Sequence, residues 1–266
     1  MEGNGLLVTR ALKKGESFLR IPRSVMLTAQ RAFKEGELGS FIAGNPLTSQ
    51  VPSLALALRL LAEVVLGRDS KWAPYIDTLP KTYGTPLFFN KDEWTRLKRT
   101  DAYFQALRLA ANTTLQYVYV YESLANKPLS GLPLPAFTLA RFMWAVSTVM
   151  SRQNKIPQFD DAGKQIGEDI ALIPLWDLCN HAEGEITTDF NSQADCLESF
   201  SLSDFKENEQ VRMYYGPRPN ADLLVWQGFV FPPNTHDNMV IDAAPLTASD
   251  LAPQLTSLLS LVRKIW

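Results

Sequence analysis

The hydrophobic positions divide the chain into two β-prone segments with a helical segment between them. Residues 6–10 and 17–21 are apolar and β-prone, and the polar turn at 13–16 separates them, which predicts two short strands. From Ala29 the period changes to that of a helix. β character returns after residue 170, with strands expected at 185–190, 196–200 and 210–214.

The middle segment carries helix start and stop signals. Pro52 and Gly67 bound the apolar run 54–66, which predicts a helix with defined ends. Asn90 followed by Glu93 predicts a capping box. Further helices are expected at 92–98, 101–126, 138–151, 221–227 and 248–266. In 101–126 the tyrosines alternate as in a strand, but the length and the alanines favour a helix. We expect an α+β fold in which both β segments form one core and the helices are inserted into it.

Composition narrows the partners and the compartment. A net charge of −2 and a pI near 5.8 give no broad attraction for nucleic acid or anionic lipid. The longest apolar run contains Arg59 and Glu63 and is too short to span a bilayer, so no membrane association is expected. Two cysteines are too few for a disulfide framework or a four-thiolate zinc site. With no signal-peptide pattern at the start, a reducing compartment is expected, and the abrupt start suggests a fragment.

One stretch concentrates polar groups at the end of an apolar run. Residues 170–173 are apolar, Pro174 follows, and an acid, a thiol, an amide and an imidazole then lie within a few residues. Burying such groups costs free energy unless their polar atoms are satisfied, so something must be bound or braced there. A second polar and aromatic cluster occupies 213–218, and we expect the two clusters to meet.

Several chemistries compete for this stretch. Two histidines in the whole chain, without a His-Glu-x-x-His pattern, argue against a metal site, and we expect none. A nucleophilic Cys179–His181 pair is disfavoured, because an apolar setting raises the pKa of a thiol. A simpler interpretation is that Asn180 and His181 only brace a tight chain crossing. Neither a Gly-x-Gly-x-x-Gly helix entry nor a phosphate-binding loop is present, but the glycine-rich turn at 2–6 would let backbone approach a ligand.

Four motifs together resemble a known family. They are Gly-Asn-Gly-Leu at 3–6, Ser-Arg-Gln-Asn at 151–154, Asp-Leu-Cys-Asn-His at 177–181 and Tyr-Gly at 215–216. In this order and rough spacing they resemble the SET-domain methyltransferases with a long helical insert, a subgroup that includes the Rubisco large-subunit lysine methyltransferase. Residues 172–181, 186–188 and 72–80 look most like members that methylate a histidine of actin, and the resemblance runs from about Glu2 to Asp242.

The resemblance implies a domain organisation and a cofactor. Residues 1–30 and 151–242 would form the two parts of the SET core, 31–150 the helical insert, and 243–266 the beginning of a C-terminal helical substrate-binding domain. S-adenosyl-L-methionine would be the methyl donor. Donor and acceptor would enter a narrow channel from opposite faces, beside a knot-like crossing of the Asn-His and Tyr segments.

The resemblance also assigns site residues. Arg152 would pair with the donor carboxylate, and Tyr215 would place its hydroxyl beside the methyl group as the catalytic residue. The remaining donor contacts would be Glu2, Gly3, Asn4, Asp177, Leu178, Cys179, Asn180, His181, Gln227 and Phe229. The acceptor pocket would be lined by Asn154, Trp176, Tyr215 and Arg218.

Alternatives remain for each role and for the whole protein. Arg152 alone would be read as a surface ion pair and Trp176 as a core residue, and strand alternation leaves Tyr214 in the core. Gln227 departs from the small residue that the family usually has before Gly-Phe. We expect a monomeric histidine methyltransferase of the cytoplasm, with the nucleus as a second compartment. A lysine methyltransferase and an inactive protein that only binds a partner are the rivals.

Overall fold

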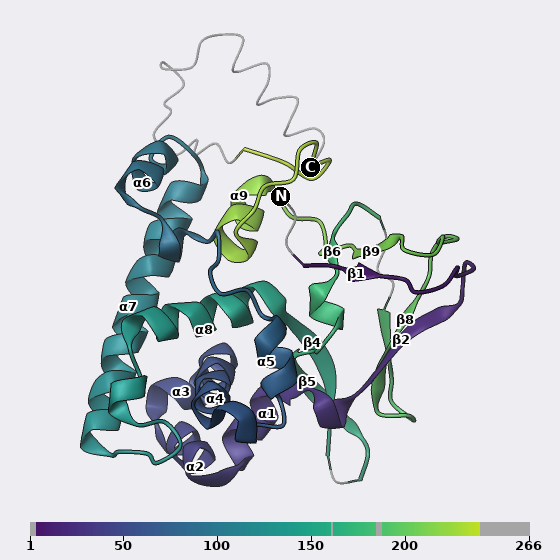
Figure 1. The fold of residues 1–266 in the computed structure, drawn as a ribbon. Helices are drawn as coiled ribbons and strands as arrows, with labels where there is room; N and C mark the ends of the chain where they lie inside the picture. Colours follow the sequence, from purple (N-terminus) through teal and green to yellow (C-terminus); the bar gives the residue numbers. More distant parts are fainter. Residues whose placement is uncertain (1–3, 161, 185–187, 240–266) are drawn as a thin grey trace.

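The computed structural model describes residues 4–160, 162–184 and 188–239 (Figure 1). Within these residues the helices gather on one side of the molecule and the short strands on the other (Figure 1). The amphipathic segment expected at 248–266 lies outside them, as do Glu2 and Gly3. No helix in the described part is long and apolar enough to cross a membrane.

Strands from the two ends of the chain pair with each other. β1 (Leu6–Leu7) is antiparallel to β9 (Gln210–Met213), and β6 (Asn180–His181) runs parallel to β9 on the other side. β2 (Ser17–Pro22) pairs with β8 (Cys196–Phe200), which also pairs with β7 (Thr188–Asn191). β3 (Leu27–Thr28) pairs with β5 (Gln165–Leu172). Among the described residues these strands form three small sheets, and apolar side chains from all three share one hydrophobic cluster, which confirms the expected common core.

One hairpin was missed by the sequence pattern. β4 (Gln153–Phe159) runs antiparallel to β5, so β structure begins before residue 170. The hairpin is mostly polar and half exposed, and it therefore lacks the apolar alternation that marks a strand. An aspartate and a glycine in its turn are the sequence feature that could have indicated a hairpin. Asp160 Oδ1 accepts hydrogen bonds from the backbone of Ala162 and Lys164, and Gly163 has φ +76°.

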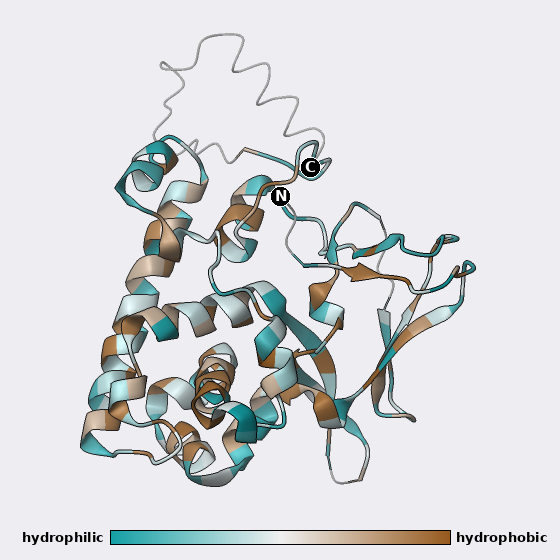
Figure 2. Ribbon diagram, viewed as in Figure 1, coloured by the Kyte–Doolittle hydropathy of each residue, from teal (hydrophilic) through white to brown (hydrophobic). Residues whose placement is uncertain are grey.

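The helical side is built around α4 (Pro52–Leu66), which is hydrophobic along most of its length (Figure 2). Leu54 to Ala62, apart from Arg59, are buried on α4. The surrounding helices are α1 (Ala29–Lys34), α2 (Gly36–Gly44), α3 (Pro46–Gln50), α5 (Ala73–Thr78), α7 (Ala102–Asn126) and α8 (Leu139–Arg152). The periods expected for α4, α7 and α8 are confirmed, including a helix where the tyrosines alternate. Tyr117 stacks on Phe137 inside, while Tyr119 and Tyr121 are partly exposed.

Short helical turns complete the described chain. They are η1 (Arg23–Val25), η2 (Gly67–Asp69), η3 (Pro86–Phe88), α6 (Lys91–Leu97), η4 (Leu134–Ala136), η5 (Trp176–Leu178), α9 (Asn220–Asp222) and η6 (Leu223–Gln227). η6 is a π-helical turn that ends at Gly228, at φ +83°, where the sequence predicts a stop. Predicted strands 196–200 and 210–214 correspond to β8 and β9, whereas β1 is shorter than predicted and part of 185–190 lies outside the described residues.

The capping box on α6 gives a first testable prediction. Asn90 Oδ1 accepts from the backbone of Asp92 and Glu93, and Glu93 Oε2 accepts from the backbone N–H of Asn90 at 2.7 Å. Asn90→Ala should lower the free energy of unfolding by about 1 kcal/mol, because two backbone donors lose their acceptor. Chemical denaturation measures the loss. Lys91→Ala, at the exposed neighbouring position, should leave stability unchanged, and an equal loss in both variants would contradict the prediction.

Candidate functional site

The two polar clusters of the sequence meet at the pairing of β6 with β9. Asn180 lies opposite Arg212 and His181 opposite Met213, so that Tyr214 and Tyr215 follow directly beside His181. The backbone N–H of Tyr215 donates to His181 Nδ1 at 3.3 Å, and the Tyr215 hydroxyl donates to the Cys179 carbonyl at 2.8 Å. The expected meeting of the two clusters is therefore confirmed.

His181 braces this crossing from within an aromatic cluster. The rings of Tyr214, Tyr215, Phe229 and Phe231 surround its imidazole, with the Phe231 centroid 4.7 Å away. Burial lowers the pKa of His181, so the ring is neutral at pH 7 and accepts the hydrogen bond at Nδ1. The bracing interpretation therefore holds for His181.

Asn180 differs from its neighbour. Its Nδ2 atom is buried without a hydrogen-bond partner among the described residues. A Cβ atom added at Gly5 would lie 2.9 Å from that nitrogen, which places the N-terminal turn directly against the amide. Asn4 precedes this contact and is exposed. The Asn180 amide is thus available to a ligand beside the turn, and simple bracing does not account for it.

Arg152 stands at the junction of α8 and β4, next to Asp177. Its Nη1 donates to the Asp177 carbonyl at 2.5 Å and lies 3.7 Å from the Asp177 carboxylate, and its side chain is 16% exposed. The alternative of a surface ion pair is therefore wrong. Arg152 Nε is buried and has no hydrogen-bond partner within the described part of the chain. A guanidinium donor held in this way suits a carboxylate ligand.

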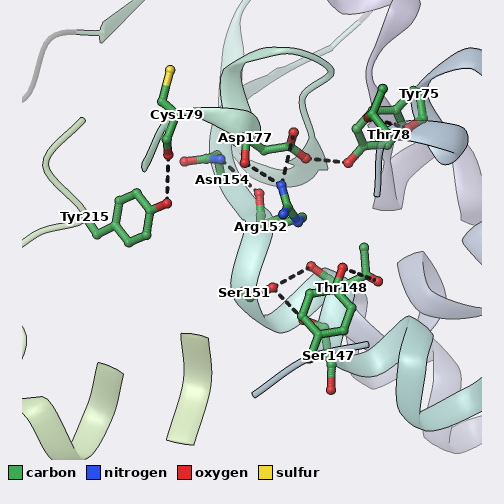
Figure 3. A network of polar contacts seen from close by, with 11 residues as sticks. Tyr75, Thr78, Ser147, Thr148, Ser151, Arg152, Asn154, Asp177, Cys179 and Tyr215 are labelled. Atoms are coloured by element: carbon green, nitrogen blue, oxygen red, sulfur yellow. Dashed lines mark hydrogen bonds and ion pairs between the residues drawn. The ribbon is translucent and has the colours of Figure 1, made fainter. Parts of the chain in front are cut away.

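Asp177 is anchored from the helical side of the molecule. The Tyr75 hydroxyl on α5 donates to Asp177 Oδ2 at 2.5 Å, on the opposite side of the carboxylate from Arg152 (Figure 3). Burial raises the pKa of Asp177 to about 6, while Arg152 and Tyr75 act to lower it. Asp177 is therefore predominantly ionised at pH 7.

Trp176 follows a strained turn. Leu175 has φ 66° and ψ −48°, and the Trp176 N–H donates to the Pro174 carbonyl at 2.8 Å, which is the hydrogen bond of a γ-turn. A positive φ at a leucine is unfavourable, and the surrounding structure holds it in place. Trp176 is 4% exposed and packs in the β core, but it also lines a cavity, so core residue and cavity wall are both correct descriptions.

A cavity of about 1120 Å³ brings together seven of the thirteen predicted site residues that the structure describes. Its walls come from α4, α7, α8, β4 and the segment around Tyr215. The predicted residues that line it are Arg152, Asn154, Trp176, Asp177, Tyr215, Arg218 and Gln227. Asn4, Leu178, Cys179, Asn180, His181 and Phe229 lie outside its lining, and the last two form the aromatic cluster behind Tyr215.

Hydrogen bonds to backbone hold the acceptor-side residues Asn154 and Arg218, whereas the predicted donor contact Gln227 has an unpaired oxygen. The Asn154 amide nitrogen donates to the Arg152 carbonyl at 3.1 Å, and Arg218 Nε donates to the Tyr215 carbonyl at 3.1 Å. Both side chains are therefore fixed by backbone of the site itself. Gln227 Oε1 is buried without a hydrogen-bond partner among the residues described. Its departure from the family pattern thus places an unsatisfied acceptor in the cavity wall.

Two expectations about neighbouring side chains are settled by burial. Tyr214 is half-buried, and its hydroxyl is 2.7 Å from His236 Nε2, so its assignment to the core was wrong. A strand that ends at Met213 no longer enforces alternation at 214 and 215. Cys179 is fully buried, and burial together with nearby Asp177 raises the pKa of its thiol to about 12. A thiol that stays protonated is a poor nucleophile, which argues against the Cys–His pair.

The sequence interpretation missed the helical contribution to the site. Tyr75 lies in the motif at 72–80, to which the resemblance assigns no site role, and the polar residues Gln105, Arg108, Asn112 and Gln116 belong to none of the motifs, although these four line the cavity. Their spacing of three to four residues on α7 was a readable signal, because it puts them on one helix face.

Known proteins were compared with this chain in sequence and in fold. No family model matches the chain. Proteins named actin-histidine N-methyltransferase are 42% identical in Gallus gallus, 43% in Danio rerio and 41% in Homo sapiens, each over 242 residues. Each match covers 90% of this chain and 40% of the relative, so the chain spans about two-fifths of the length of these curated relatives.

Solved structures show the same fold at lower identity. The SET domain of LSMT bound to lysine and AdoHcy has a TM-score of 0.71 at 21% identity, with 88% of this chain and 52% of that chain covered. Rubisco LSMT bound to AdoMet has a TM-score of 0.69 at 21% identity, with 87% and 50% covered. The chain therefore has the SET-domain fold, and over 90% of its length its sequence is similar to those of the actin-histidine N-methyltransferases.

Proposed function

We propose that the chain is the SET portion of an S-adenosyl-L-methionine-dependent protein-histidine N-methyltransferase whose substrate is actin. The observation that carries the proposal is the cavity in which Arg152, Asn154, Trp176 and Tyr215 converge from separate elements. The names of the relatives support the acceptor, and the solved structures of this fold bound to AdoMet or AdoHcy support the cofactor. Cytoplasmic location, with the nucleus as a second site, and a monomeric state belong to the same proposal.

The residues present fit the methyl donor. Arg152 Nε, Asn180 Nδ2 and Gln227 Oε1 are buried polar atoms without hydrogen-bond partners among the described residues. Arg152 would hold the donor carboxylate, while Asn180, beside the turn at Gly5, and Gln227 would hold its amino end and adenine. When bound, S-adenosylmethionine supplies an electrophilic methyl group.

The acceptor side suits a flat, neutral ring. A histidine with a pKa of about 6.5 is largely neutral at pH 7, so its nitrogen already carries a lone pair. The Asn154 nitrogen is committed to the Arg152 carbonyl, and its side-chain oxygen can therefore accept the N–H of the other ring nitrogen. Trp176 forms a wall of the cavity against which the imidazole plane can pack.

Tyr215 is built to stay protonated during transfer. Burial raises the pKa of its hydroxyl to about 12, and the Cys179 carbonyl accepts its proton in a hydrogen bond. Tyr215 is therefore no general base at pH 7, and its oxygen acts through position and partial charge. The proton that the methylated imidazolium releases passes to solvent. Alignment in a water-poor channel supplies most of the catalysis.

Lysine is the alternative acceptor, favoured by solved structures of this fold that are bound to lysine or monomethyllysine. An alkyl-ammonium packs its stem on apolar walls and uses an aromatic face for its charge. The polar Asn154 in this cavity favours an imidazole instead. The two acceptors also differ in pH dependence, because lysine must lose a proton with a pKa of about 10.4.

A swap of two cavity residues tests the acceptor. Asn154→Phe with Trp176→Ala should lose activity on a histidine-containing actin peptide and gain some on the same peptide with lysine in that place. The gained activity should keep rising above about pH 8, while parent activity levels off above about pH 7. Mass spectrometry of both peptides measures the transfer.

Gln158→Phe, further along β4 and outside the cavity lining, is the control and should behave as the parent. Parent activity on the lysine peptide that equals or exceeds its histidine activity would reject the histidine assignment. Peptide binding by the parent without any methyl gain would instead favour an inactive binding protein.

A further inference from the structure

Tyr75 connects the helical segment to the site without touching the cavity. It lies on α5, whereas Asp177 lies 102 residues later on η5, and both side chains are buried. The Tyr75 hydroxyl donates to Asp177 Oδ2 at 2.5 Å, and Asp177 Oδ1 has no hydrogen-bond partner among the described residues. Tyr75 therefore supplies the only hydrogen bond that the carboxylate receives within the described part of the chain. Tyr75 is absent from the cavity lining, while Asp177 and Arg152 belong to it.

Asp177 in turn contacts the Arg152 guanidinium, which also has Tyr83 as a neighbour. The Asp177 carbonyl accepts from Arg152 Nη1 at 2.5 Å, and Asp177 Oδ1 is 3.7 Å from the same nitrogen. At that distance the carboxylate attracts the guanidinium but forms no direct hydrogen bond with it. The tyrosine hydroxyl holds the other carboxylate oxygen on the far side (Figure 3).

We propose that Tyr75 is a positioning residue of the donor site, which restrains Asp177 so that Arg152 remains available to the carboxylate of the methyl donor. This inference rests on the proposed function, since it takes that donor as the ligand of Arg152. Tyr75, which lies in the helical segment and outside the cavity, would thus influence the affinity for the donor through Asp177 and Arg152.

The direction of the effect follows from the charges. Without the tyrosine hydroxyl, the buried Asp177 carboxylate loses its hydrogen bond and keeps one cationic neighbour, Arg152. Loss of the hydroxyl also raises the pKa of Asp177 above about 6, so the effect is measured near pH 8, where the carboxylate stays ionised. There an unsatisfied buried carboxylate gains most by closing on the guanidinium and forming a paired contact with it. Arg152 would then be occupied by Asp177, and a donor carboxylate would have to compete for it.

A merely structural role for Tyr75 makes a different prediction. The ring packs in the helical core, which phenylalanine would preserve. Tyr75→Phe would then lower stability somewhat and change donor binding no more than any other lost buried hydroxyl. Tyr117→Phe is the matched control, because its hydroxyl donates to the Phe137 carbonyl at 3.3 Å and is likewise part of the helical core.

The test is the dissociation constant of S-adenosylmethionine, measured by calorimetry on the parent, Tyr75→Phe, Asp177→Asn, the double variant and Tyr117→Phe. Tyr75→Phe should raise it roughly tenfold, the size expected for one hydrogen bond to a buried charge. Turnover at saturating donor should stay within about twofold of the parent. The double variant should bind S-adenosylmethionine no more weakly than the single variant with the lower affinity, because Tyr75 acts on Arg152 only through Asp177.

Three outcomes would overturn the inference. They are a change below about twofold in Tyr75→Phe, additive losses in the double variant, or an equal loss in Tyr117→Phe. Should Tyr75→Phe fail to fold, Asp177→Asn, which removes the charge that the Tyr75 hydroxyl restrains, should raise the dissociation constant roughly tenfold in its place, and a change below about twofold would overturn the inference. Absence of donor binding by the parent would refute the proposed function as well, which separates the two failures.

Discussion

Tyr215→Phe should lower turnover by about a hundredfold while leaving the melting temperature close to that of the parent. The hydroxyl lies in the cavity wall and is held by the Cys179 carbonyl at 2.8 Å, whereas the ring packs against His181 at 5.0 Å and would remain. Removal of one fixed dipole beside a developing charge typically costs this much in rate. The measurement is kcat and KM with an actin peptide, and the loss should be in kcat.

Tyr214→Phe is the natural control for this result. Its hydroxyl contacts His236 at an exposed edge and lies outside the network around Cys179, so its turnover should match the parent. If both variants lose activity equally, or if Tyr215→Phe turns over as the parent does, Tyr215 does not act at the reacting atoms.

Gly228→Ala should destabilise the fold by about 3 kcal/mol. A Cβ atom there would lie 2.8 Å from the Gly84 carbonyl carbon and 2.9 Å from the Thr85 nitrogen, and both are backbone atoms that cannot rotate away. The backbone at Gly228 also has φ +83°, which costs a residue with a Cβ about 1 kcal/mol. The overpacking adds the remainder. Chemical denaturation gives the free energy of unfolding.

Gly15→Ala separates the two contributions. Gly15 also has φ +83°, but nothing lies within 4 Å of the position of its Cβ, so only the conformational cost of about 1 kcal/mol applies. Equal losses at both glycines would show that the contact between residues 84 and 228 is unimportant. A larger loss at Gly228 would show that the close backbone contact with Gly84 and Thr85 contributes to stability.

Local signals accounted for the elements that the sequence predicted well. Pro52 and Gly67 mark the ends of α4, Asn90 and Glu93 mark the start of α6, and Gly228 stops η6, because each acts within one helical turn. The β4–β5 hairpin was not predicted, because its strands lack such local signals. Its residues are polar, and its pairing rests on backbone hydrogen bonds that leave no hydrophobic period.

The site was predictable only in part. The motifs named Arg152, Asn154, Trp176 and Tyr215, and the fold does bring them to one cavity. The hydrogen bond of Tyr75 to Asp177 spans 102 residues, and no local pattern encodes such a contact. The burial that leaves Asn180 Nδ2 without a partner is likewise a property of the folded chain.

The most direct test of the account is methyl transfer to actin itself. Purified actin that lacks the modification is incubated with the protein and S-adenosylmethionine carrying an isotopically labelled methyl group, and tandem mass spectrometry locates the label. The account predicts one labelled methyl group on a histidine ring nitrogen, reduced about a hundredfold with Tyr215→Phe. Label on lysine, or none on actin while donor binding is measurable, would contradict it.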